Sequence, residues 1–288
     1  MLICGRHRVA LDRPRVMGVL NVTPDSFFDG GRYADRHRAL DHARRMLDDG
    51  AAIVDIGGES TRPGAAPTSA AEELDRVLPL FDALSAECDA RGVPLSVDTR
   101  NPAVMRGAIA AGASMVNDIN ALRAEGALEL VAASGAAVCL MHMQGEPLTM
   151  QRSAVYEDDV VAVVSAFLAE RAATCERAGI ARGRIAVDPG FGFGKTTAHN
   201  LDLLQRLDEI AGLGYPVVAG LSRKSTIGAL TGRPVDERAA GSLAAALAAV
   251  ARGAALVRVH DVRETVDALK VWQAVQTGRH AGGASGSA

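Results

Sequence analysis

The sequence predicts a single α/β domain folded as a (β/α)8 barrel, and three observations lead to that prediction. Eight short apolar runs recur along the 288 residues, longer amphipathic stretches separate them, and 48% of the residues are hydrophobic. Near-continuous apolar runs without polar alternation are typical of parallel strands that are covered on both faces. A barrel of this kind typically needs about 250 residues, so the chain is long enough for one.

The strands are expected at RVMGVLN (15–21), AAIVDIG (51–57), PLSVDT (94–99), SMVNDI (114–119), AAVCLMH (136–142), RIAVDPG (184–190), PVVAGLS (216–222) and AALVRVH (254–260). Amphipathic stretches between them predict helices, among them 35–50, 155–179 and 261–276. Gly50, Gly112, Gly135 and Gly179 stand shortly before a run, as glycines at helix C-termini do. An open doubly wound sheet could also hold eight strands, but no GxGxxG follows the first run, which disfavours a dinucleotide-binding fold.

Composition narrows the class of protein. The net charge of −3 argues against a nucleic-acid partner, which usually requires a basic surface. Four cysteines without a CxxC pair indicate free thiols in a reducing compartment. The N-terminus lacks the apolar region of a signal peptide, and no apolar run reaches the roughly 18 residues of a membrane span. We therefore expect a cytoplasmic protein without membrane contact, one domain over residues 1–277, and a disordered Gly/Ala/Ser-rich tail at 278–288.

Polar residues stand at the ends of the expected strands: Asn21, Asp55, Asp98, Asn117, Asp118, His142, Asp188, Ser222, Arg258 and His260. In a barrel these ends face one side of the molecule, where barrel enzymes place their active sites. A single aspartate at such a point is often only a cap or a loop anchor, and we interpret Asp55 and Asp118 in that way. Capping does not explain so many polar strand ends together.

Two loops and two charged segments suggest an anionic, phosphorylated substrate. The loops NVTPDSFFDGGRY and GGESTRPGAAPTS, after the first two strands, are long enough to act as lids. SRKS (222–225) opens a helix and RVH (258–260) ends the last strand, and barrels often bind phosphate after strands 7 and 8. Arg223 could also be a solvated surface charge, an interpretation that suits Lys224 and Arg258 less.

Three features are set aside or left open. The segment GFGFGKTT (190–197) lacks the first glycine of a Walker A loop, since position 189 is proline. A zinc site is not predicted at His142. Met141 and Met143 suit core packing, although a methionine at a strand end could also line a flat heterocycle.

Several of these segments, in this order, resemble the dihydropteroate synthases of the pterin-binding family, from about residue 15 to 276. They are MGVLNVTPDSFFDGG, DIGGESTRPGA, SVDT, MVNDI, CLMHMQG, DPGFGFGK followed by HN, GLSRKS and RVHDV. The resemblance implies a (β/α)8 barrel, usually a homodimer. It implies an enzyme that joins p-aminobenzoate to (7,8-dihydropterin-6-yl)methyl diphosphate, with Mg2+ accompanying the diphosphate, to give 7,8-dihydropteroate and pyrophosphate.

The resemblance also implies roles for individual residues. We expect the pterin edge to bind Asp98, Asn117, Asp188 and Lys224, with Met141 and Phe193 packed against its ring. The diphosphate is expected to bind Thr61, Arg62, Arg258 and His260, and the metal to bind Asn21. The p-aminobenzoate pocket is expected to be formed by Phe27, Pro63, Phe193 and Ser225, with the attacking amine near Asp29. Asp29, Arg62 and Lys224 are the expected catalytic residues. The sequence departs from the family in DSFFDGG, where DSFSDGG is more usual, and Phe28 thereby puts sulfonamide sensitivity in question.

Two other functions stay open on the sequence. A corrinoid-dependent methyltransferase would share the pterin-edge residues but would not need STRPG or the SRKS and RVH cluster. A non-catalytic pterin-binding paralogue should have lost diphosphate or loop residues, yet Asn21, Thr61, Arg62, Lys224, Arg258 and His260 are all present.

Overall fold

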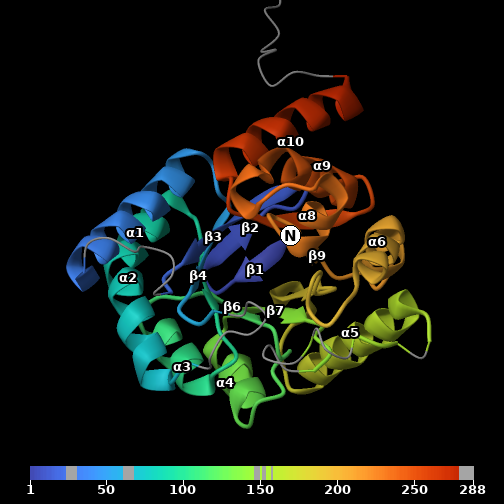
Figure 1. Cartoon of the computed structure of the whole chain (residues 1–288). Helices are drawn as coiled ribbons and strands as arrows, with labels where there is room; N and C mark the ends of the chain where they lie inside the picture. Colours follow the sequence, from blue (N-terminus) through green and yellow to red (C-terminus); the bar gives the residue numbers. More distant parts are fainter. Residues whose placement is uncertain (24–30, 61–67, 146–149, 151–153, 157, 279–288) are drawn as a thin grey trace, which may run out of the picture.

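The chain folds as a closed eight-stranded parallel barrel surrounded by helices, as predicted (Figure 1). The computed structural model describes residues 1–23, 31–60, 68–145, 150, 154–156 and 158–278, and only the backbone of residues 31–34. Neighbouring strands are parallel all the way round, and the last strand pairs with the first. This closure excludes the open doubly wound sheet, because an open sheet would leave two edge strands unpaired.

The eight barrel strands are β3 (Arg15–Asn21), β4 (Ile53–Gly57), β5 (Leu95–Asp98), β6 (Met115–Asp118), β7 (Ala137–Met141), β8 (Ile185–Asp188), β9 (Val217–Ala219) and β10 (Ala254–Val259). Each lies within its predicted run. Two predicted ends are wrong, since β8 ends two residues before 190 and β9 three residues before 222. The polar segments that follow these two strands are therefore loops above the barrel.

The helices are α1 (Gly31–Asp48), α2 (Ala70–Arg91), α3 (Pro102–Ala110), α4 (Ala127–Ser134), α5 (Val160–Arg177), α6 (Thr197–Gln205), α7 (Leu207–Ala211), α8 (Ser225–Thr231), α9 (Ala239–Val250) and α10 (Val262–Thr277). The short 3-10 helices η2 (Arg182–Arg184) and η3 (Val235–Glu237) complete the set in the described residues. The helix expected from residue 155 begins at Val160, because the Asp159 side chain caps it by accepting from the Val161 amide at 3.2 Å.

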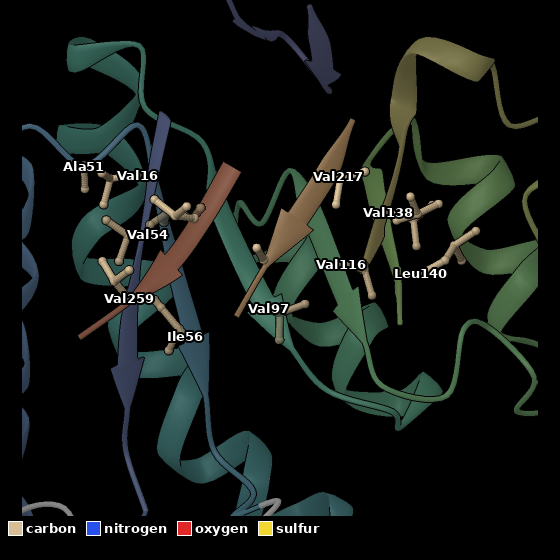
Figure 2. Close-up of a cluster of buried hydrophobic side chains, with 14 of the residues drawn as sticks. Val16, Ala51, Val54, Ile56, Val97, Val116, Val138, Leu140, Val217 and Val259 are labelled. Atoms are coloured by element: carbon tan, nitrogen blue, oxygen red, sulfur yellow. The ribbon is translucent and has the colours of Figure 1, made fainter. Parts of the chain in front are cut away.

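Two apolar layers hold the barrel together. The larger one lies between strands and helices and contains outward-facing apolar residues of every strand. Figure 2 labels ten residues of this layer. The smaller one fills the N-terminal end of the barrel with residues such as Met17, Ile53 and Leu256. Burial on both sides explains why the strands read as continuous apolar runs.

A feature that the sequence analysis missed closes the smaller layer. Strands β1 (Leu2–Cys4) and β2 (His7–Val9) form an antiparallel hairpin, which lies across the centre of the view in Figure 1. Leu2, Cys4 and Val9 pack on the inward-facing residues at the N-terminal ends of the barrel strands. The hairpin therefore covers the end of the barrel that lies opposite the polar strand ends.

In the described residues, no helix is both long and apolar enough to cross a membrane. The predicted division into a domain over 1–277 and a disordered tail stays a prediction, since residues 279–288 lie outside the described part of the chain.

Candidate active site

The polar residues at the C-terminal ends of the strands meet at one mouth of the barrel because of the strand register. Asn21 pairs with Gly57, Gly57 with Asp98, and Asp98 with Asn117. Further round the barrel, Met141 pairs with Asp188. Residues from six strands are thereby placed at the same mouth, although the chain separates some of them by more than a hundred positions.

Arg258 joins the acidic part of this mouth. Its Nε donates to Asp55 Oδ2 at 2.6 Å and its Nη2 to Asp98 Oδ2 at 2.5 Å. Asn117 Nδ2 donates to the same Asp55 oxygen at 3.0 Å. Burial opposes the charge on Arg258, but its two carboxylate partners raise its pKa above the usual value. We call Asp55, Asp98, Asn117 and Arg258 the acidic cluster.

Asp55 is not the cap or loop anchor that the sequence suggested. Its side chain is 0% exposed, and it holds both Arg258 and Asn117. Asp118 does act as a loop anchor, because its two oxygens accept from the amides of Asn120 and Leu122, each at 2.7 Å. The sequence places both aspartates at strand ends and therefore could not separate the two roles.

Asp188 and Lys224 lie beside this cluster. A methyl group built on Gly220 would be 3.7 Å from both Asp188 Oδ2 and Lys224 Nζ, and 3.9 Å from Arg258 Cβ. Burial raises the pKa of Asp188, with the charge of Lys224 opposing the shift. Burial lowers the pKa of Lys224 to about 8, and here Asp188 opposes the shift. At neutral pH Lys224 is therefore still mostly charged.

An apolar wall stands next to these polar groups. Met141, Met143, Ile119 and Met150 form a buried cluster, with Phe193 packed against it. Lys224 Nζ lies 4.7 Å from the centre of the Phe193 ring, within cation–π range. Met141 and Phe193, which were both expected against the pterin ring, thus lie in one apolar wall beside hydrogen-bonding groups.

The segments after β9 and β10 form a second group. Ser222 Oγ lies 3.0 Å from His260 Nδ1 and accepts from the His260 amide at 3.2 Å. Burial, and then the charges of Arg258 and Arg223, lower the pKa of His260 to about 4. The His260 ring is therefore neutral at neutral pH in the free protein and can supply a hydrogen bond there. Ser225 is exposed at the start of α8.

Arg223 is not a solvated surface charge. Its guanidinium forms an ion pair with Asp261, with Nε 3.0 Å from Oδ2, and its amide donates to Ser242 Oγ at 2.9 Å. Its φ of +59° lies in the left-handed region. These contacts fix the turn that delivers Lys224 to the mouth of the barrel.

The segment GFGFGKTT also behaves differently from a phosphate-binding loop. Lys195 Nζ points into the protein, where it lies 2.9 Å from His142 Nδ1 and donates to the carbonyls of Gly190 and Phe193 at 3.0 Å. Burial, and then the charge of Lys195, lower the pKa of His142 to about 3, so its ring is neutral. Across the described ranges, no group of three or more His, Cys, Asp or Glu side chains could hold a metal ion.

Several expected site residues cannot be placed. Phe27, Phe28, Asp29, Thr61, Arg62 and Pro63 lie outside the described residues. Asn21 lies at the end of β3, half-buried. The structure also adds Glu73 and Lys195, two buried charged residues that the sequence analysis did not select, because a glutamate in an amphipathic helix and a lysine in a glycine-rich loop are normally solvated.

Comparisons with known proteins agree with this geometry. Residues 17–260 match the family model described as "Pterin binding enzyme". The chain is 50% identical to the dihydropteroate synthase of Escherichia coli K12 over 264 residues, which cover 92% of each chain.

Solved structures show the same likeness. The Xanthomonas albilineans dihydropteroate synthase with 4-aminobenzoic acid is 54% identical, with a TM-score of 0.88 over 95% of this chain and 97% of that one. The structure of the same enzyme with 7,8-dihydropteroate is 52% identical, with a TM-score of 0.86 over 95% of this chain and 97% of that one. The Yersinia pestis enzyme with a sulfonamide drug is 48% identical, with a TM-score of 0.89 over 96% of this chain and 100% of that one. The chain therefore belongs to the pterin-binding enzyme family, as a member of its dihydropteroate synthases.

Proposed function

We infer that the chain joins p-aminobenzoate to (7,8-dihydropterin-6-yl)methyl diphosphate and releases 7,8-dihydropteroate and pyrophosphate. This inference rests on one observation: the acidic cluster, the neighbouring side chains of Asp188 and Lys224, and the apolar wall of Met141 and Phe193 lie together at one mouth of the barrel. A pterin has N–H donors and a carbonyl acceptor along its edge and two flat faces. The three parts of the site complement these features.

The edge of the pterin would be held by Asp98, Asn117, Asp188 and Lys224. Charge-assisted hydrogen bonds of this kind are roughly twice as strong as neutral ones. A heterocycle that left one of these buried groups unpaired would bind about 1–3 kcal/mol less well. In the free protein, Arg258 balances the negative charges of Asp55 and Asp98. We therefore assign Arg258 mainly to the pterin end of the site. Its contact with diphosphate stays a prediction from the family resemblance.

The reaction itself needs little covalent help from the protein. The bond between the pterin methylene carbon and the diphosphate oxygen breaks, and its electron pair leaves with the diphosphate. The amine nitrogen of p-aminobenzoate then forms the new carbon–nitrogen bond and loses one proton. The electron-rich pterin can delocalise positive charge on the methylene carbon, so we propose a dissociative substitution, in which positioning and electrostatic stabilisation dominate.

The remaining substrate contacts are proposals from the resemblance. Thr61 and Arg62 would hold the diphosphate together with a hydrogen bond from His260. Phe27, Pro63, Phe193 and Ser225 would form the p-aminobenzoate pocket, and Asp29 would approach the amine. Loops that cover the mouth would exclude water, which could otherwise capture a cationic carbon.

A side-chain oxygen at the end of β3 is suited to hold Mg2+ together with the diphosphate. Mg2+ prefers oxygen ligands, usually keeps several waters, and binds through one or two carboxylates together with substrate phosphates. Asn21 Oδ1, at the end of β3 beside the side-chain-free Gly57, would supply that oxygen. When bound, the ion would neutralise part of the diphosphate charge.

We also propose a homodimer in the cytoplasm. Val271 and Val275 stand four residues apart on α10 and are 66% and 74% exposed, as large apolar residues of an unpartnered helix face would be. All four cysteines are free and buried, which suits a reducing compartment. Val275→Lys should shift the mass measured by light scattering from dimer to monomer, while an unchanged mass would place the interface elsewhere.

The direct test of the function is continuous measurement of pyrophosphate release by the purified protein. Release that requires both p-aminobenzoate and the pterin diphosphate, with 7,8-dihydropteroate as the second product, is the expected result. A pterin-dependent methyltransferase or a non-catalytic pterin-binding protein would release no pyrophosphate, so that outcome would reject the proposal.

A further inference from the structure

The loop between β8 and α6 contains a tight turn, which we call the glycine turn (residues 190–194). Gly190, Gly192 and Gly194 all have positive φ values, between 62° and 80°. A methyl group on Gly190 would lie 1.9 Å from the carbonyl oxygen of His142, and one on Gly194 would lie 2.4 Å from that of Gln144. The turn is therefore pressed against the segment that follows β7.

Lys195 ties these two segments together from the inside. Its side chain is 3% exposed. The ammonium group lies 2.9 Å from His142 Nδ1, 3.3 Å from the His142 carbonyl, and 3.0 Å from the carbonyls of Gly190 and Phe193. A single buried amino group thus links the glycine turn to the end of the neighbouring strand.

The outer side of the same turn holds groups of the pterin site. The Gly190 amide donates to Asp188 Oδ1 at 2.7 Å. Lys224 Nζ donates to the Phe191 carbonyl at 2.5 Å, and its Cδ would lie 3.2 Å from a methyl group on Gly192. Phe193 contributes the ring above which Lys224 Nζ lies. The glycine turn therefore holds Asp188, Lys224 and Phe193 in place together.

We propose that Lys195 is a positioning residue of the pterin site: its buried ammonium shapes the glycine turn so that Phe193, Lys224 and Asp188 meet the pterin in one arrangement. This inference rests on the proposed function, because it assumes that a pterin occupies this mouth. Lys195 itself would not touch the substrate.

Burying the Lys195 ammonium costs free energy, because the group loses its hydration. Burial lowers the pKa of Lys195 to about 7, with the charge of Asp188 opposing the shift. A methionine would fill similar space without this cost, but the Phe193 carbonyl would lose its Lys195 donor, and the Gly190 carbonyl would keep only the Phe193 amide. Those carbonyls could then turn toward other donors, and the turn would lose its single conformation.

The test compares wild type with Lys195→Ala and Lys195→Met, and uses Lys270→Met as the matched control. Lys270 is an exposed lysine of α10 whose ammonium pairs only with Asp267 in the described structure. Calorimetry with the pterin diphosphate gives the fraction of binding-competent molecules and their affinity separately. The expected result is a loss of affinity of about 100-fold in both Lys195 variants, because small displacements of positioning groups have effects of this size. The control should bind as wild type does.

A rescue experiment separates positioning from folding. Lys195→Ala removes the equivalent of a propylammonium ion, so added propylamine at neutral pH should restore pterin affinity, whereas propan-1-ol should not. The double variant Lys195→Met with Phe193→Ala should lose less than the sum of the two single losses, because both act through the same turn.

Three results would overturn the proposal. Wild-type affinity in the folded fraction of either Lys195 variant would make the lysine purely structural, and so would failure of both variants to fold. Equal rescue by the amine and the alcohol would show that volume alone matters. If wild type neither binds the pterin diphosphate nor releases pyrophosphate, the proposed function fails first, independently of Lys195.

Discussion

Replacing Glu73 by glutamine should stabilise this protein at alkaline pH and change little near pH 5. Glu73 lies in the first turn of α2 and is 1% exposed, and Oε1 has no hydrogen-bond partner in the described structure. Burial raises its pKa from 4.5 to about 7; a hydrogen bond with Thr99 opposes the shift, and the charges of Glu59 and Asp98 add to it. The native protein therefore favours the neutral carboxyl group.

The magnitude follows from that shift. Moving from 4.5 to about 7 is about 2.5 pH units, and each unit corresponds to about 1.36 kcal/mol. The folded-state pKa is raised, so the stability that the neutral carboxyl contributes is complete below pH 4.5 and is lost progressively as the pH rises through 7. Glutamine stays neutral throughout. The variant should therefore exceed wild type in unfolding free energy by roughly 3 kcal/mol at pH 8 and by less than about 1 kcal/mol at pH 5.

Urea unfolding followed by circular dichroism at pH 5 and pH 8 measures both values. Glu129→Gln makes the same chemical change at an exposed position of α4 and should leave stability nearly unchanged at either pH. If the advantage of Glu73→Gln is the same at both pH values, Glu73 does not titrate with a raised pKa and the burial argument is wrong.

Three further predictions concern the barrel mouth. Asp188→Asn should abolish pterin binding, because the carboxylate that accepts from the heterocycle is lost; undiminished affinity in calorimetry would contradict its edge-recognition role. Arg258→Ala should weaken free pterin as well as the pterin diphosphate, since it leaves the buried Asp55 and Asp98 without their cation; a loss confined to the diphosphate would favour the sequence-based assignment instead. Gly190→Ala should lower the melting temperature and pterin affinity together, because its methyl group would clash with the His142 carbonyl; a wild-type melting curve would show that the glycine turn can yield.

The sequence alone determined the barrel and the polar strand ends at its mouth. Eight apolar runs are visible because strands buried on both faces have apolar residues at most positions. Asp98, Asn117 and Asp188 could be selected because a parallel barrel brings all strand ends to one side, whatever their separation in the chain. The helix C-termini could also be predicted, because Gly50, Gly112, Gly135 and Gly179 adopt the positive φ values that glycines take after helices.

Only the tertiary structure decided which charged groups are partners. Asp55 and Asp118 look alike in the sequence, yet one binds Arg258, 203 positions away, and the other binds its own loop. Lys195 and Glu73 look like solvated residues until packing removes them from water. The pKa of a side chain depends on its burial and on the charges within a few ångströms, and sequence periodicity records neither. The N-terminal hairpin escaped prediction for a related reason, since its three-residue strands are stabilised by the barrel end they cover.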